Sequence, residues 1–582
     1  MAKEKTTGSK GGSASEESPP MGFPLRRELI VVACSEASLR ASKKGLRSLA
    51  SLDLSSISDI LDSKGATMLP LFGPSEERIK ARTTALSMVS SMPVPDLSVY
   101  YNVDAPDGEL DGLAQRLMKA DQVEAAYVKP AGELPLMLND MLPHADEAPS
   151  TTPNFVARQI YLNAAPAGID AQYAWTQPGG GGAGVRIIDC EWAWRFTHED
   201  LTQNQGGVVA GTQVNDLPSR NHGTAVMGEF GGDRNTFGIT GICPDAVASG
   251  SSFSQPTASA IRQAADKLGP GDIMLLEIHR AGPRYNFQGR ADQAGYIAVE
   301  WWPDDFDAIR YAISRGIIVV EAAGNGAENL DDAIYNVRPA GFPAGWTNPF
   351  NHNNRDSGAV VVGAGAPPEG THGRNHGPDR SRLAFSNYGS LIDAQGWGRE
   401  VTSCAYGDLQ GGSNEDLWYT DQFSGTSSAS PIVVGALGCV QGALKAKGRI
   451  PLSPARAREL LRSTGSPQQD APGRPATQRI GNRPNLRQLI PAALETGMWT
   501  GVQFKGTVPA GQTICWYTFN WPAHWHVFWT VVPTTVRSGA PQIRWKVRVE
   551  RASDRFITYW ICITNIGSAS TEVEGRYSVL GW

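Results

Sequence analysis

The chain has 582 residues, several times the usual size of one folding unit, so we expect several domains and a large buried core. Charged residues make up 19% of it, and the net charge is −6 without a long run of one sign. A sequence with this balance has no basic run of the kind that binds nucleic acid, and we expect no nucleic-acid partner. The seven cysteines are scattered without a CxxC pair, which argues against a zinc site or a disulfide framework. Most should be small buried apolar residues.

The N-terminal 24 residues are rich in Gly, Ser, Lys and Glu, and residues 1–24 are predicted to be disordered. They lack the apolar core of a signal peptide, and no later stretch looks long and apolar enough to span a bilayer. We therefore expect no membrane span, and either a cytoplasmic location or unconventional release. The sequence gives no sign of an oligomeric state.

Residues 25–135 have the pattern of a small α/β domain. A buried strand begins at Glu28, a helix is predicted over 55–64 and a second strand over 97–104. An amphipathic helix and the strand VEAAYVKP complete the unit. Residues 136–156, rich in Pro, Asp, Ser and Thr, resemble an exposed linker open to proteolysis.

Residues 157–495 alternate apolar strands with helices. The strands are predicted over 185–189, 273–279, 317–324 and 359–366, and helices over 257–268 and 304–316. Near-continuous apolar strands between helices indicate an α/β fold with a doubly wound parallel sheet covered on both faces. Residues 499–582 contain short strands dense in Trp, Thr and Val, which predict an all-β sandwich.

Four side chains suited to acyl transfer follow elements of this sheet. Ser427, in SGTSSASP, stands at the predicted start of a long apolar helix. A serine nucleophile needs a base, a group that orients the base, and donors for the oxyanion. His222 in NHGT is the candidate base, Asp189 ends the strand VRIID, and Asn325 follows the strand IIVVEAAG. Because ligands of parallel sheets bind at the carboxyl ends of the strands, we expect the four to meet there.

The order Asp, His, Asn, Ser with HGT, AAGN and GTSxAxP resembles the subtilisin-like serine proteases, or subtilases, over roughly residues 163–464. The resemblance implies Ser427 as nucleophile, His222 as general base, Asp189 as its orienter and Asn325 in the oxyanion hole. It also implies extended polypeptide substrates that pair as added strands with two protein edges. The implied substrate-binding residues are Leu276, Glu277, Ile278, His279, Ala322, Ala323 and Gly324.

The same resemblance gives the N-terminal domain a role. Subtilases commonly carry an α/β propeptide that assists folding and occupies the active cleft. We therefore expect a serine endopeptidase made as an autoprocessed zymogen, inhibited in cis by its own propeptide and cut in the linker. The chemistry requires no cofactor. A structural calcium ion is compatible with the family, but no metal ligand set stands out in the sequence.

Two departures from the family leave alternatives open. Cys190, Glu191 and Trp192 follow Asp189 where the family usually has Ser or Thr and then Gly, and Glu277 to His279 replace Ser, Leu and Gly. Glu277, Glu300 and Glu321 are either an acidic substrate pocket or ordinary paired carboxylates. The chain could also be a pseudoprotease or a binding protein whose function lies in the Trp-rich sandwich, with its tryptophans as glycan or cell-surface platforms or as core.

Overall fold

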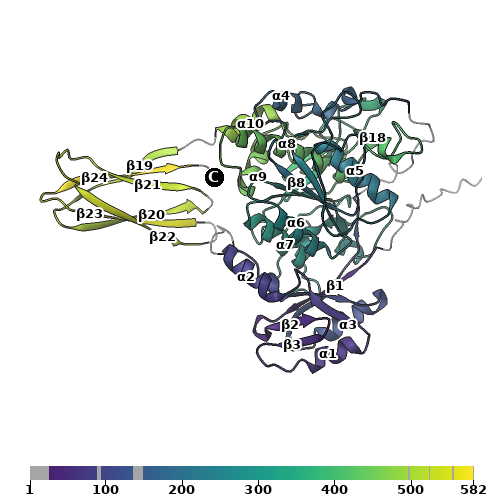
Figure 1. The fold of residues 1–582 in the computed structure, drawn as a ribbon, viewed down its shortest axis with the longest axis horizontal. Helices are drawn as coiled ribbons and strands as arrows, with labels where there is room; N and C mark the ends of the chain where they lie inside the picture. Colours follow the sequence, from purple (N-terminus) through teal and green to yellow (C-terminus); the bar gives the residue numbers. More distant parts are fainter. Residues whose placement is uncertain are drawn as a thin grey trace, which may run out of the picture.

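The structure is a computed structural model that describes residues 25–87, 93–135, 149–495, 499–523, 525–553 and 556–580. The predicted disordered tail and most of the predicted linker, residues 136–148, lie outside them. Figure 1 shows an N-terminal, a central and a C-terminal body, the last extending away from the other two.

The N-terminal body is an antiparallel sheet in the order β4-β5-β1-β6. These strands are Thr67–Pro70, Tyr100–Asp104, Glu28–Ala33 and Val123–Lys129; β2 (Leu39–Ser42) pairs with β3 (Gly45–Ser48), and the helices are α1 (Ser55–Asp62), α2 (Glu76–Ser87) and α3 (Leu110–Leu117). Successive side chains of β1 point to opposite faces. Leu29 and Val31 enter the body's own core, whereas Ile30 and Val32 join the core of the central body. The N-terminal sheet is therefore packed against the central body.

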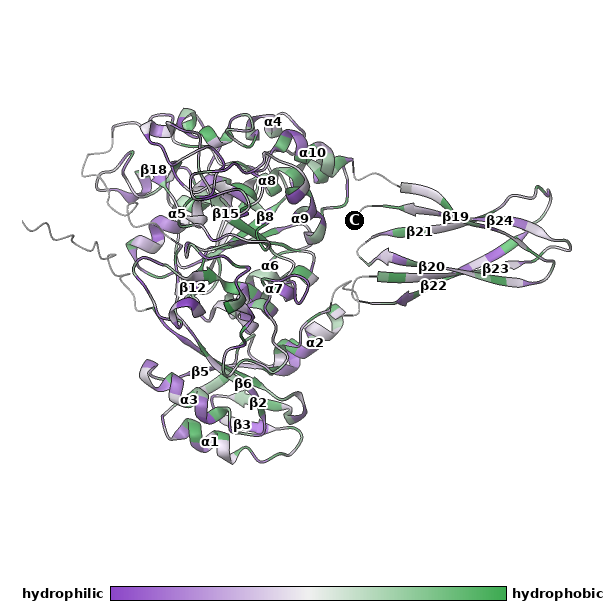
Figure 2. Ribbon diagram, turned by 180° about the vertical axis from the view of Figure 1, so that it is seen from behind, coloured by the Kyte–Doolittle hydropathy of each residue, from purple (hydrophilic) through white to green (hydrophobic). Residues whose placement is uncertain are grey.

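The central body is built on a seven-stranded parallel sheet in the order β16-β15-β14-β11-β8-β10-β9. These strands are Ala394–Trp397, Val360–Gly365, Ile318–Ala322, Ile273–Leu276, Arg186–Glu191, Val247–Ser252 and Gln205–Ala210. One face is covered by α4 (Ala171–Trp175), α5 (Leu217–Gly231), α8 (Thr426–Ala446) and α10 (Leu486–Leu494), the other by α6 (Thr257–Lys267) and α7 (Pro303–Ser314). A further helix, α9 (Pro454–Ser463), and a two-stranded pair, β17 (Val401–Cys404) with β18 (Tyr419–Phe423), lie outside the sheet. The predicted doubly wound α/β fold is confirmed, and Figure 2 shows its central strands as largely hydrophobic.

Helix α8 corrects the expectation that no stretch of the chain is long and apolar enough to span a bilayer. Its 21 residues are long and apolar enough to cross a membrane by length and composition. Its residues from Thr426 to Leu444 are buried, however, and the helix packs on the central strands of the sheet. It is the core helix of the central body.

The C-terminal body is a sandwich of two antiparallel sheets, β19-β24-β21 and β20-β23-β22, as predicted. The strands are β19 (Trp499–Val508), β20 (Thr513–Pro522), β21 (Val527–Pro533), β22 (Ile543–Arg551), β23 (Phe556–Asn565) and β24 (Thr571–Val579). Trp521 and Trp529 fill the core between the sheets. Tyr517, Phe519 and Trp560 are instead exposed, with the Tyr517 and Trp560 rings 5.2 Å apart. A binding role for this body stays a prediction.

Two cysteines differ from the sequence expectation, which argued against a disulfide framework. Cys515 on β20 and Cys562 on β23 form a disulfide. They are direct cross-strand partners in the sheet. Four of the other cysteines are buried as expected, namely Cys190, Cys243, Cys404 and Cys439.

Candidate active site

Ser427 lies in the first turn of α8, at the carboxyl edge of the sheet. The helix begins after Gly425, whose φ of 112° is in the left-handed region that favours glycine. A Cβ atom at Gly425 would lie 2.3 Å from the carbonyl oxygen of Pro135. The Ser427 hydroxyl donates a hydrogen bond to that same oxygen at 3.0 Å. Pro135, the last described residue before the linker, is therefore hydrogen-bonded to the candidate nucleophile.

His222 lies on α5, which packs beside α8. The next residue, Gly223, has no room for a side chain, because a Cβ atom there would lie 2.2 Å from the Ala193 carbonyl oxygen. The glycine of NHGT thus lets the loop after β8 approach the helix. His222 is fully buried, which lowers its pKa to about 3. Its Nε2 has no hydrogen-bond partner within the described residues.

The carboxylate in contact with His222 is Glu191, where the sequence analysis placed Asp189. Glu191 Oε2 lies 2.8 Å from His222 Nδ1. Asp189 instead accepts a hydrogen bond from Trp194 Nε1 at 2.7 Å. The reason is that β8 runs on to Glu191, two residues past the predicted strand end. Since alternate residues of a strand share a face, Asp189 and Glu191 both point toward the site, and Glu191 is the nearer to the strand's carboxyl end.

Asn325 follows β14 and is held against the start of α8. Its Oδ1 accepts hydrogen bonds from the Thr426 backbone N–H at 2.9 Å and the Thr426 hydroxyl at 3.0 Å. Its Nδ2 donates to Gln293 Oε1 at 3.2 Å. An amide nitrogen carries two protons, so a second donor remains for an oxygen at Ser427.

The N-terminal body sends a short strand into the edge of the site. β7 (Gly132–Glu133) pairs antiparallel with β12 (His279–Ala281), which also pairs with β13 (Tyr296–Ala298). His279 is the partner of Glu133 in this register. The expected pairing of an extended segment with this edge is thus present, and Pro135 on Ser427 is two residues farther along the same segment.

Individual contacts hold this resident segment. Gln293 Nε2 donates to the Leu134 carbonyl at 3.0 Å, and the Tyr296 hydroxyl donates to Glu133 Oε1 at 2.6 Å. A Cβ atom on Gly132 would lie 2.4 Å from Ile278 Cδ1. The edge therefore leaves little room for a side chain at the Gly132 position. The sequence did not predict Gln293 and Tyr296 as site residues, because they lie on a loop and a short strand without a motif.

The other predicted substrate-binding residues lie deeper. Leu276 ends β11 and is fully buried, as are Ala322 and Ala323 at and after the end of β14. The Gly324 N–H donates to the Thr426 hydroxyl at 3.2 Å, so Gly324 lies beside the start of α8. Among the seven predicted residues, Ile278 and His279 are those with described contacts to the resident segment.

The three glutamates of the possible acidic pocket are fully buried. The Glu277 carboxylate accepts a hydrogen bond from Ser430, and the Glu300 carboxylate accepts one from Ser357. Glu321 Oε1 accepts from the Glu300 backbone N–H at 3.1 Å. Burial raises the pKa of all three, that of Glu321 to about 8. The carboxyl groups are therefore bonded inside the protein and do not line an open pocket.

A buried ion cluster joins the N-terminal and central bodies. Lys129 Nζ lies 2.6 Å from Asp304 Oδ2, 2.9 Å from Asp305 Oδ1 and 3.1 Å from Glu28 Oε2. Arg280 Nη2 adds a contact of 2.7 Å with Glu28 Oε1. Lys129, Arg280 and both aspartates are fully buried, so a displaced partner would leave charges without water or counterion.

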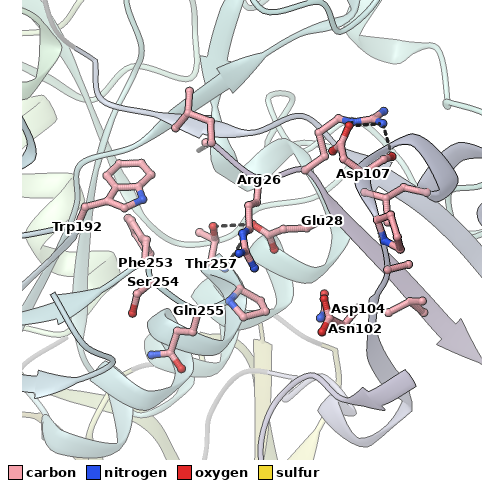
Figure 3. Close-up of a pocket in the computed structure, with 18 of the residues that line it drawn as sticks. Arg26, Glu28, Asn102, Asp104, Asp107, Trp192, Phe253, Ser254, Gln255 and Thr257 are labelled. Carbon is pink, nitrogen blue, oxygen red and sulfur yellow. Dashed lines mark hydrogen bonds and ion pairs between the residues drawn. The ribbon is translucent and has the colours of Figure 1, made fainter. Parts of the chain in front are cut away.

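A groove of about 870 Å³ runs beside this cluster, between the N-terminal body and the start of α6. Figure 3 shows Glu28 and Thr257 facing each other there, with Trp192 and Phe253 on the wall. The Thr257 hydroxyl donates to Glu28 Oε1 at 3.0 Å. A carboxylate at a helix N-terminus is favourable, so Glu28 also anchors the N-terminal body to α6.

No group of three or more His, Cys, Asp or Glu side chains in the described part of the chain is arranged to hold a metal ion.

A model of the Subtilase family matches residues 168–482, more than half of the chain. The chain belongs to the Subtilase family. This subtilase is 26% identical over 271 residues to an alkaline protease of Alkalihalobacillus alcalophilus, a match that covers 45% of this chain and 54% of that protein. The chain thus spans about half the length of that relative.

Subtilisin Savinase of Lederbergia lenta is also 26% identical, over 45% of this chain and 77% of its own. Among solved structures, fervidolysin of Fervidobacterium pennivorans, described as a keratinolytic enzyme related to subtilisin, aligns with 95% of this subtilase and 70% of its own chain. That alignment has a TM-score of 0.47 and 16% identity.

Proposed function

We propose that this subtilase is a serine endopeptidase that hydrolyses polypeptides, the first of them its own chain at the bond between Pro135 and Leu136. The observation that carries the proposal is the Pro135 carbonyl, held 3.0 Å from the Ser427 hydroxyl at the end of an added strand. Residues 25–135 are then a propeptide that occupies the cleft until, and after, the bond is cut.

The proposed reaction begins with attack of Ser427 Oγ on the Pro135 carbonyl carbon. His222 Nε2 takes the hydroxyl proton as the C–O bond forms, and later gives it to the leaving amine of Leu136. Glu191, against Nδ1, holds the imidazole in the tautomer whose Nε2 can accept a proton, and balances the imidazolium that forms. Water then hydrolyses the acyl-enzyme by the same proton route in reverse.

The oxyanion needs donors in place before the reaction starts. Asn325 Nδ2 and the backbone N–H of Ser427 at the start of α8 are the candidates. Asn325 is fixed by two hydrogen bonds from Thr426, so its amide is preorganised. In subtilisin, loss of the equivalent oxyanion-hole asparagine lowers turnover by about 10²- to 10³-fold.

The propeptide is also proposed to inhibit in cis after cleavage. Gly132 to Pro135 occupy the strand position that a substrate would take, and the buried Lys129 cluster holds the domain behind them. Release of this domain would open the edge to other polypeptides.

A fluorophosphonate probe that labels activated serines tests the proposal. We expect labelling of the wild type after the propeptide has been removed, and none of Ser427→Ala. His222→Ala should fold but label at a rate lower by several orders of magnitude, since the serine loses its base. A propeptide-free protein that neither labels nor hydrolyses any peptide would favour the pseudoprotease alternative.

A further inference from the structure

Asp189 and Glu191 form a buried pair of carboxyl groups behind His222. Both side chains are fully buried, and they lie two residues apart on one face of β8. Glu191 Oε2 contacts His222 Nδ1, and Asp189 Oδ2 accepts from Trp194 Nε1. The other two oxygens, Asp189 Oδ1 and Glu191 Oε1, have no donor among the described residues. Two ionised carboxylates are both acceptors and cannot satisfy each other, whereas a proton on one of them would supply the donor that these buried oxygens lack.

The charges around the pair favour keeping that proton. The titratable groups next to it are His222 on α5, which contacts Glu191, and Glu277 after β11, whose pKa is raised by burial and by the two carboxyls; Cys190 lies between them in the chain but on the opposite face of the strand. In the part of the chain that the structure describes, no lysine or arginine forms an ion pair with either carboxyl. Burial raises the pKa of both groups, and a second negative charge in this interior would be costly.

The two partners indicate which group holds the proton. Glu191 faces an imidazole N–H, which becomes a cation during the reaction and favours the ionised carboxylate. Asp189 faces only the neutral indole N–H of Trp194. Burial, and then the neighbouring Glu191 carboxylate, raise the pKa of Asp189 well above its usual range. The proton therefore belongs on Asp189.

We propose that Asp189 is a positioning residue that stays protonated and donates its proton to Glu191, which in turn orients His222. This inference rests on the proposed function, because it concerns the base of that reaction. The unit behind His222 is then one negative charge shared over two carboxyl groups. Such a unit stabilises the imidazolium less than a lone carboxylate does, so activity should extend to lower pH than a single aspartate would allow.

The Asp189→Asn variant copies the proposed state. Its amide oxygen can still accept from Trp194, and its NH₂ can still donate to Glu191. Asp189→Ala removes both contacts. Glu229→Gln is the matched control, a buried carboxyl on the helix of His222 that contacts neither member of the pair. The assay is kcat/KM from pH 4 to 9 on a fluorogenic peptide copying residues 130–139, with propeptide-free enzyme.

We expect Asp189→Ala to lower kcat by about tenfold or more and to move the acid limb of the profile upward by about one pH unit, as Glu191 becomes a lone, more basic carboxylate. Asp189→Asn should rescue most of that loss and restore the acid limb of the wild type. A loss of about 10⁴-fold in Asp189→Asn would mean that Asp189 is the ionised orienter, and would overturn the proposal. An Asp189→Ala profile identical to that of the control would also overturn it, since Asp189 would then only anchor Trp194.

A second measurement separates failure of this inference from failure of the proposed function. In the inactive Ser427→Ala protein, infrared difference spectra at neutral pH should show the carbonyl stretch of a buried protonated carboxyl group that Asp189→Asn removes. An inactive wild type with this band would refute only the peptidase. Absence of any band assignable to Asp189 would refute the carboxyl pair, whatever the activity.

Discussion

Replacing Lys129 with methionine should loosen the proposed propeptide, residues 25–135, from the peptidase domain. The ammonium group makes three contacts of 3.1 Å or less, with Asp304, Asp305 and Glu28, and is fully buried. Methionine keeps the length of the stem but leaves three carboxylates facing Arg280 alone. Removing one partner of a buried ion pair typically costs about 3–5 kcal/mol, because the other charges stay buried without compensation.

At about 1.4 kcal/mol for each factor of ten, this cost corresponds to a dissociation constant for the cleaved propeptide raised by roughly 10²- to 10³-fold or more. The assay is gel filtration of the processed complex, together with the rate at which peptidase activity appears on dilution. Lys119→Met is the control, a substitution of an exposed lysine in the same domain. A Lys129→Met complex that stays as tight as wild type, or a control that dissociates equally fast, would refute the reasoning.

Three further changes have defined outcomes. Gly132→Val should slow self-cleavage by roughly ten- to a hundredfold, because the added side chain overpacks against Ile278. The appearance of the processed band measures the rate, and the further change Ile278→Ala should restore it. An unchanged rate in Gly132→Val would contradict the subsite. Cys515→Ser should destabilise the C-terminal body by about 4 kcal/mol in denaturant unfolding, because the bond to Cys562 closes a 47-residue span. Burial lowers the pKa of His198 to about 4 from 6.5, so the unfolded chain binds the proton first as pH falls. His198 alone should then contribute a fall of about 1.4 kcal/mol per pH unit in the free energy of unfolding between pH 6.5 and 4, and His198→Gln should remove that part of the slope.

Local patterns were enough to predict most of the framework. The apolar runs at 185–189 and 359–366 are strands of the parallel sheet, and Ser427 does lie at the start of a long helix, because burial on both faces and helix periodicity are local signals. The candidate residues Ser427, His222 and Asn325 lie at the carboxyl edge of the sheet, where ligands of parallel sheets bind. Their roles in catalysis stay predictions.

The partner of His222 was not predictable by the same means. A strand predicted to end at Asp189 leaves Glu191 in the following loop, because charged residues seldom continue a buried strand. The alternation of a strand offered a signal, since it puts residue 191 on the face of residue 189 and nearer the carboxyl end. Extending the strand by two residues would have made Glu191 a candidate.

Long-range pairings were beyond reach of the sequence. Cys515 and Cys562 meet because two strands pair in one register, and a shift of one residue would separate them. Pro135 reaches Ser427 across 292 positions of the chain, through docking of a whole domain by Lys129 and Glu28. Such contacts depend on assembled surfaces that no local pattern encodes.

The most direct measurement is the mass and N-terminal sequence of the purified full-length protein as it matures, beside Ser427→Ala. We predict that the wild type alone splits, that the larger fragment begins at Leu136, and that this fragment carries the fluorophosphonate label once the propeptide is removed. A first residue after Thr152, or equal cutting of Ser427→Ala, would contradict the assignment of Pro135 and Ser427 to the reacting bond.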